Sequence, residues 1–456
     1  MVPPASGCSQ FNSTNHLSRR GLLQAGTLGV LGLGLADALQ PTAAAESGKG
    51  TAKACIVLFM WGGPSHLDTW DPKPDAMSEV RGPFRTIATT TPGLRISEHF
   101  PRLAKQAHQY ALIRSMTHND PAHLSTVHHI LTGRLAPRPN SDQDPPSRFD
   151  SPHIGSIVAK MKPGSGPLPG FITLPWIVSH PAAPGGVAPG QSGGWMGQTH
   201  DPFLVTGDPN HPQFRVGGLA ETGDVSYQRL NGRHALLQHL DAKSTDTSGY
   251  DTMQQKAFGL LSSQEAETAF DLSKEPVAMR DRYGRHTHGQ CCLLARRMIE
   301  AGTKLVCVNW PNDGHTFWDT HGNNFESLKT RLMPPADQGF SALLEDLDQR
   351  GMLDETLVVW VGEFGRAPRI SAASAGREHW PRCYSAVLAG GGVRGGIVYG
   401  SSDKIGAYPA DNPTSPADLV ATIYTALGIP PDTTVLDRLG RQLTLTDGTP
   451  IRAILS

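Results

Sequence analysis

Four short clusters of histidine and carboxylate residues carry the chemistry that this sequence could perform. They occupy residues 61–71, 118–134 and 312–322, and the fourth combines 362–366 with 376–380. Imidazole and carboxylate groups are ligands that suit Zn, Mn or Fe, and carboxylates also suit Ca or Mg. One such cluster is weak evidence, but four in chain order, each after an expected strand, predict a divalent metal site.

The candidate ligands are the imidazoles and carboxylates of these clusters. Glu363 follows an apolar run, where a buried carboxylate is costly unless it is paired or metal-bound. A divalent cation would lower the pKa of bound water and neutralise an anionic ester oxygen, but the metal, whether Zn, Ca, Mg or Mn, stays open. We expect Asp319, His321 and Glu363 among the ligands, with His66, Asp68, His123, His315 and His379 as further candidates.

Three residues are candidates for catalysis. His123 could act as a covalent nucleophile, a general base or a ligand, because imidazole serves all three roles. Arg366 and Arg377 could clamp sulfate or phosphate oxygens through paired hydrogen bonds. The alternative is that the two arginines form structural bridges with Glu363 and Glu378.

The composition excludes some classes of partner, and the N-terminus indicates export. Forty basic and 41 acidic side chains give a net charge of −1, so nothing favours nucleic acid or an anionic membrane as a general partner. Ser18-Arg19-Arg20 precedes an apolar stretch that ends near Leu39, and small residues follow up to Ala45. This order resembles a twin-arginine signal peptide. We therefore expect residues 1–45 to be a signal that directs the chain to the periplasm, or otherwise exports it, through the twin-arginine machinery, with no membrane span left after cleavage.

Apolar runs that end abruptly in glycine or polar residues predict the elements that position the clusters. The expected strands are 55–61, 110–113, 305–310, 356–361 and 386–389, with helices at 290–301 and 340–350. This alternation predicts an α/β domain over 46–456, with a mostly parallel central sheet and helices on both faces. Ligands bind such sheets beyond the carboxyl ends of the strands. Residues 134–285 are expected to form a loop-rich insert, with loops over the sheet edge and then a peripheral helical pair.

Several motifs resemble the alkaline phosphatase and sulfatase superfamily. His99-Phe-Pro-Arg-Leu-Ala resembles the helix before the sulfatase nucleophile loop, and the segment from Ser125 to Arg134 resembles the helix that ends in Leu-Thr-Gly-Arg. The run from Leu357 to Gly365 resembles the late strand that ends in an Asp-His-Gly metal motif. Gly-Gly-Pro-Ser-His, Gly-Glu-Phe-Gly-Arg and Gly-Arg-Xaa-His-Trp most resemble an uncharacterised bacterial group of sulfatase-like proteins with twin-arginine signals. The resemblance implies an alkaline-phosphatase-like fold and metal-dependent hydrolysis of sulfate or phosphate esters.

The sequence departs from the sulfatase pattern at three places. Gly62-Gly63 stands where sulfatases have two aspartates, and His123, nine residues before Thr132, takes the place of the modified cysteine or serine. Glu363-Phe364 replaces Asp-His, which keeps one oxygen ligand and loses an imidazole.

Three functional interpretations follow from these motifs and departures. The first is an exported metal-dependent hydrolase of sulfate or phosphate esters, polysaccharide esters included, by a mechanism that departs from that of standard sulfatases. The second is a non-catalytic relative that binds sulfated or phosphorylated glycans in the cell envelope. The third is an envelope protein that keeps the fold without a site.

Overall fold

The computed structural model describes residues 50–164, 166–180, 186–216, 229, 232, 236, 257–437 and 439–456. Its contacts separate two units, Met1–Gly48 and Lys49–Ser456, and the second is described below. The signal peptide expected at residues 1–45 lies outside the described residues.

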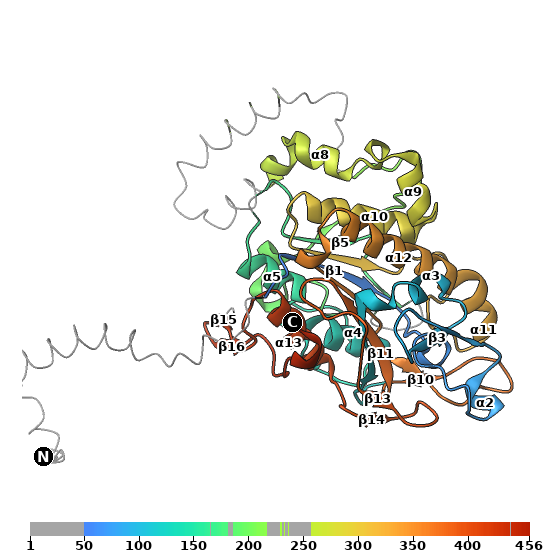
Figure 1. The fold of residues 1–456 in the computed structure, drawn as a ribbon. Helices are drawn as coiled ribbons and strands as arrows, with labels where there is room; N and C mark the ends of the chain where they lie inside the picture. Colours follow the sequence, from blue (N-terminus) through green and yellow to red (C-terminus); the bar gives the residue numbers. More distant parts are fainter. Residues whose placement is uncertain are drawn as a thin grey trace, which may run out of the picture. The chain divides into compact units, whose positions relative to one another are not determined.

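An eight-stranded, mostly parallel sheet forms the centre of the second unit (Figure 1). Only one of its strands, β11, is antiparallel to its neighbours, β4 and β8. All other adjacent pairs are parallel, as the sequence predicts. In spatial order the strands are β12 (Ile397–Tyr399), β4 (Tyr110–Met116), β11 (Tyr384–Ala389), β8 (Thr356–Val361), β1 (Ala54–Phe59), β7 (Leu305–Asn309), β5 (Phe171–Leu174) and β6 (Phe203–Leu204).

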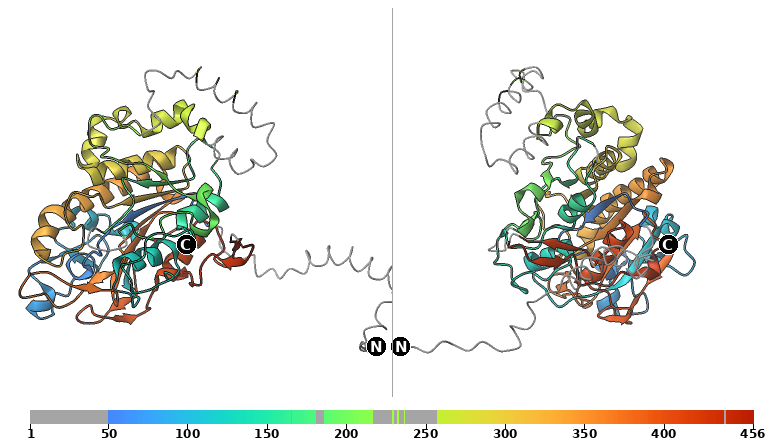
Figure 2. Two further views of the ribbon diagram at one scale, coloured as in Figure 1. Left: turned by 180° about the vertical axis from the view of Figure 1, so that it is seen from behind. Right: turned by 90° about the vertical axis from the view of Figure 1, so that its left-hand side faces the viewer.

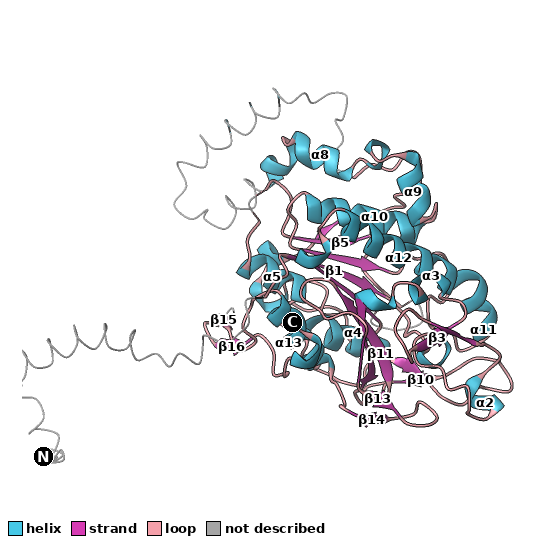
Figure 3. Cartoon of the chain, viewed as in Figure 1, coloured by secondary structure: helices cyan, strands magenta, loops and turns pink. Residues whose placement is uncertain are grey.

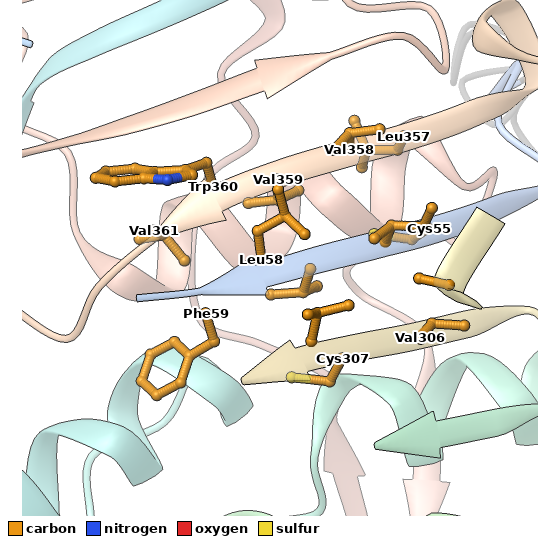
Figure 4. Packing of buried hydrophobic residues seen from close by; sticks show 14 of the residues in the cluster. Cys55, Leu58, Phe59, Val306, Cys307, Leu357, Val358, Val359, Trp360 and Val361 are labelled. Atoms are coloured by element: carbon orange, nitrogen blue, oxygen red, sulfur yellow. The ribbon is translucent and has the colours of Figure 1, made fainter. Parts of the chain in front are cut away.

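The three central strands are apolar throughout because both faces of the sheet are covered. Every residue of β1, β7 and β8 is buried. Val57 of β1 pairs with Cys307 on one side and Val359 on the other, and Figure 4 shows the packing around these strands. The five cysteines from Cys55 onward are free and buried, where a thiol packs as a small apolar side chain.

Helices cover both faces of the sheet, and the two expected helices are confirmed. The helices shown in cyan in Figure 3 lie on both sides of the magenta sheet, and Figure 2 shows the same layers from two further sides. One face carries α10 (Thr287–Glu300), α12 (Met333–Gln349) and α3 (Pro101–Ala104), with α8 (Gln264–Phe270) and α9 (Val277–Tyr283) packed against α10. The other face carries α4 (His123–Thr132), α5 (Ile154–Met161) and α13 (Pro416–Ala426).

The structure differs from the expectation at one end of the sheet. The loop-rich part of the expected insert contains regular elements: Ile154–Met161 forms α5, and Phe171–Leu174 forms β5, which pairs with β7 and extends the sheet. The apolar run of β5 is interrupted by Thr173 and lies between Gly170 and Pro175, so it does not stand out from the Pro- and Gly-rich residues around it. Most of 226–256, where part of the helical pair was expected, lies outside the described residues.

The parallel arrangement brings five strand ends to one edge of the sheet. Strands β1, β4, β5, β7 and β8 point the same way, so the loops that follow them start side by side. These loops carry the histidine and carboxylate clusters. Within the part of the chain that the structure describes, no helix has the length and apolar character needed to cross a membrane.

Candidate metal centre

Three histidines and one aspartate from three separate segments of the chain meet at this edge of the sheet. Asp319 and His321 lie in the loop after β7, and His379 belongs to the short strand β10 (His379–Trp380). His123 is the first residue of α4, directly after the loop that follows β4. Suitable atoms of His123, Asp319 and His379 all lie within 4.8 Å of one another.

Each of the three imidazoles is tied through Nδ1 to an oxygen. His123 Nδ1 lies 2.8 Å from Glu363 Oε1, and His379 Nδ1 lies 2.8 Å from the carbonyl oxygen of Pro121. His321 Nδ1 lies 2.7 Å from Glu378 Oε2. A carbonyl or carboxylate oxygen accepts hydrogen bonds, so each Nδ1 donates and each Nε2 faces the cluster.

Asp319 is the common neighbour of these Nε2 atoms. Its Oδ1 lies 3.0 Å from His321 Nε2 and 3.2 Å from His379 Nε2, while Oδ2 lies 3.4 Å from His123 Nε2. Arg366 also donates to Oδ1. The arrangement therefore surrounds one carboxylate with three ring nitrogens and a guanidinium group.

The charges of the cluster explain its perturbed pKa values. Burial by itself raises the pKa of Asp319, but Arg366 and the surrounding histidines outweigh it and hold that pKa well below its usual range. Burial also disfavours the charged form of His123, but the two carboxylates outweigh this and raise its pKa to about 9. Hydrogen bonding to Asp319 raises the pKa of His321, whereas burial lowers that of His379. Without a metal, His123 is therefore the ring that holds a second proton at neutral pH.

Glu363 lies behind His123 and not among the inward-facing atoms. Its carboxylate is fully buried and accepts the Gly62 N–H at 3.0 and 3.2 Å, in addition to His123 Nδ1. Glu363 is thus near the expected position, but both of its oxygens already have partners.

The glycine pair after β1 supports this arrangement through its main chain. The carbonyl oxygens of Gly62 and Gly63 both accept hydrogen bonds from Arg366. Gly62 has φ +107°, and a Cβ at this position would lie 2.5 Å from the Asp319 nitrogen and 2.7 Å from that of Trp318. The close approach of the two loops therefore requires glycine here.

Both arginines expected to clamp a substrate are fully buried and directed at acceptors within the protein. Arg366 donates to Asp319 and to the main-chain carbonyls of Gly62, Gly63 and Arg377. Arg377 holds Asp68 through two hydrogen bonds of 2.7 and 3.0 Å. In this geometry the two guanidinium groups support the loops that carry the site.

The structure places three further ligand candidates outside this group of atoms. Asp68 accepts from Arg377, Ser65 and Asn324. The His66 Nε2 atom lies 2.8 Å from the Gly406 carbonyl oxygen. His315 is exposed in the loop after β7.

Sequence reasoning missed His180, which follows β5. Its Nε2 lies 3.6 Å from Asp319 Oδ2, and its ring stacks on that of His123 with centroids 4.7 Å apart. Because β5 was not recognised, nothing placed this histidine at a strand end. Trp61 and Phe364 complete the surroundings of His123, with ring centroids 5.0 and 4.9 Å from its imidazole.

The donor set fits a divalent cation. The Nε2 atoms of His321 and His379 lie only 2.8 Å apart, and the buried Nε2 of His123 has no hydrogen-bond partner. A cation in place of the Nε2 protons would satisfy these nitrogens, and the carboxylates and carbonyl behind each Nδ1 are the usual outer partners of metal-binding histidines.

Fold and site together define a mostly parallel α/β protein with a histidine-rich candidate metal centre. Residues 52–455 match the family described as "Protein of unknown function (DUF1501)", and the chain belongs to that family. No match was found among the curated proteins.

Several solved structures have a similar arrangement of the chain. A protein in the alkaline phosphatase superfamily from Vibrio parahaemolyticus is 9% identical, with TM-score 0.38, covering 84% of this chain and 68% of that one. A phosphonate monoester hydrolase from Silicibacter pomeroyi is 12% identical, with TM-score 0.37, and the match covers 89% of this chain and 76% of that one. A sulfatase from Pseudoalteromonas sp. is 14% identical, with TM-score 0.35, and the match covers 85% of this chain and 70% of that one. Similarity of this extent says nothing about substrates.

Proposed function

We propose that this chain is an exported, metal-dependent hydrolase of sulfate or phosphate esters. One observation carries the proposal: three histidines whose Nδ1 atoms are held by oxygens turn their Nε2 atoms toward a single carboxylate, that of Asp319. Such an arrangement costs free energy unless it serves a purpose, because the side chains of His123 and Asp319 are largely removed from water, at 3% and 10% exposed.

The donor atoms favour zinc or a similar transition metal over calcium and magnesium. His123, His321 and His379 offer three nitrogens and Asp319 offers one oxygen, whereas calcium and magnesium take mainly oxygen ligands. When bound, the cation supplies positive charge for the anionic oxygens of an ester.

The residues of the site would have separate roles in binding the cation and in catalysis. Asp319, His321 and His379 hold the cation, and Arg366 balances part of the charge of Asp319. His123, at the start of α4, presents Nε2 toward the same space and serves as nucleophile, general base or further ligand. Trp61 and Phe364 exclude water from one side of this imidazole.

Export is part of the proposal. The arginine pair at residues 19–20 and the apolar stretch behind it would direct the chain through the twin-arginine machinery, which carries folded proteins. The metal could then be loaded before export, and the enzyme would act on esters in the periplasm, including those of polysaccharides.

Elemental analysis of the purified protein, dialysed without chelator, tests the proposal. About one or more equivalents of a transition metal per chain are expected, together with turnover of aryl sulfates, aryl phosphates or aryl phosphonates. His123→Ala should abolish that turnover with the fold intact, and unchanged kinetics would remove His123 from catalysis. Bound metal without turnover would instead support a non-catalytic binder of sulfated or phosphorylated glycans. Absence of metal even after reconstitution would refute the metal-dependent hydrolase.

A further inference from the structure

Glu363 has an environment unlike that of the other carboxylates of the site. It is fully buried, and among the described residues no lysine or arginine contacts its carboxylate. Its partners are the Gly62 N–H and the Nδ1 atom of His123. The negative charge of Glu363 is therefore directed at one imidazole.

This contact determines which nitrogen of His123 faces the cluster. The carboxylate accepts the Nδ1–H, so in the neutral ring Nε2 is left with a free electron pair. Nε2 is buried, lies 3.4 Å from Asp319 Oδ2 and has no hydrogen-bond partner. Stacking on His180 and the edge contact with Trp61 fix the plane of the ring.

We propose that Glu363 is a positioning residue that orients His123 and increases the electron density on its Nε2 atom, and is not itself a metal ligand. The inference rests on the metal-dependent function proposed above. It assigns to the loop after β8 the task of preparing His123, in the first turn of α4, as the further metal ligand.

The chain contains a matched control for this role. Glu378 makes the same kind of contact, 2.7 Å from Nδ1 of His321, but its side chain is 67% exposed whereas that of Glu363 is 0% exposed. Water and salt weaken the field of an exposed charge and leave that of a buried charge largely intact. Loss of charge at Glu363 should therefore matter more than loss of charge at Glu378.

Zinc affinity of the full-length protein measures the difference, by competition with a chromophoric chelator. Glu363→Gln keeps an acceptor oxygen for Nδ1 and removes the charge, and it should weaken zinc binding about 10- to 100-fold. Glu378→Gln should change it by less than about threefold. Circular dichroism of both variants checks the fold. Equal affinities of Glu363→Gln and wild type, or equal losses in the two variants, would overturn the inference.

Cobalt substitution separates a positioning residue from a ligand. If Glu363 acts through His123, the visible absorption bands of Co²⁺ in Glu363→Gln should keep the wild-type positions, because the atoms around the ion are unchanged. A change in the coordination bands would show that Glu363 binds the ion directly, and would overturn the inference.

Failure of the proposed function can be recognised separately. If the wild type binds neither zinc nor cobalt, the hydrolase proposal fails, and ¹⁵N NMR of labelled histidines still tests the role of Glu363. At about pH 10.5, where the His123 ring is neutral, protonated Nδ1 and bare Nε2 are expected in the wild type. The opposite tautomer would overturn the inference.

Discussion

The charge that His123 carries in the metal-free protein makes a measurable difference to stability. The ring lies between Glu363 and Asp319, and its pKa is raised from 6.5 to about 9. The folded state therefore holds a proton that the unfolded state releases as the pH passes 6.5. This contribution to the free energy of unfolding is fully present below pH 6.5 and is lost as the pH rises to about 9. At 1.36 kcal/mol per pKa unit, it amounts to about 3 kcal/mol.

Urea denaturation of chelator-treated protein at pH values from 6 to 9.5 measures this contribution. Deprotonation of the buried cysteines also lowers the free energy of unfolding at high pH. The quantity to compare is therefore the difference in free energy of unfolding between wild type and His123→Asn. The asparagine amide can still donate to Glu363 but does not titrate. This difference should shrink by about 3 kcal/mol across the window.

His153→Asn is the matched control for this experiment. His153 is buried outside the cluster, and burial lowers its pKa to about 3. The difference between wild type and His153→Asn should be constant between about pH 7.5 and 9, because the folded ring is neutral there and the unfolded ring, with a pKa near 6.5, has already lost its proton. If the difference in free energy of unfolding between wild type and His123→Asn is equally independent of pH, the His123 ring is not held in its charged form by Glu363 and Asp319, and the reasoning is refuted.

Three further predictions follow from the same geometry. Zinc binding at pH 7 should release about one proton from Nε2 of His123, and calorimetry in buffers of different ionisation enthalpy would show this. No release would contradict a charged His123 ring. Gly62→Ala should destabilise the fold by about 2–4 kcal/mol, because the new methyl group meets the main chain of the facing loop. A thermal melt like that of the wild type would show that the loops can separate. Asp68→Asn should lower the free energy of unfolding by about 3 kcal/mol, because it leaves Arg377 without its buried carboxylate. Its zinc affinity should stay within about twofold of that of the wild type, and a larger loss of affinity would place Asp68 in the site.

The fold could be predicted from the sequence where apolar runs were long. The run at 356–361 coincides with β8, and the runs near 55 and 305 give β1 and β7, because strands buried on both faces need apolar residues throughout. Phe171–Leu174 escaped recognition because Thr173 interrupts its apolar run and because it lies within a Pro- and Gly-rich segment. His180 was missed with it, since its significance depends on the strand that precedes it.

The sequence predicts that the site lies at the carboxyl-terminal edge of the sheet, but it does not predict the role of each residue there. Residue type and strand ends placed Asp319, His321, Glu363 and His379 near one another. Whether a carboxylate faces the cluster or stands behind a histidine depends on side-chain direction and on main-chain partners, such as the Gly62 N–H. Asp68 and Glu363 look equivalent in the sequence, and only the structure shows that one pairs with an arginine and the other with an imidazole.

The tight turn at Gly62 limits how this site could change in evolution. Two aspartates at this point would supply further oxygen ligands, but the first would have to displace the main chain of Trp318 and Asp319. Gaining a ligand after β1 would therefore disturb the ligand already present after β7. A route by single substitutions passes through proteins with neither arrangement intact, so the glycine turn and the histidine cluster should be gained or lost together.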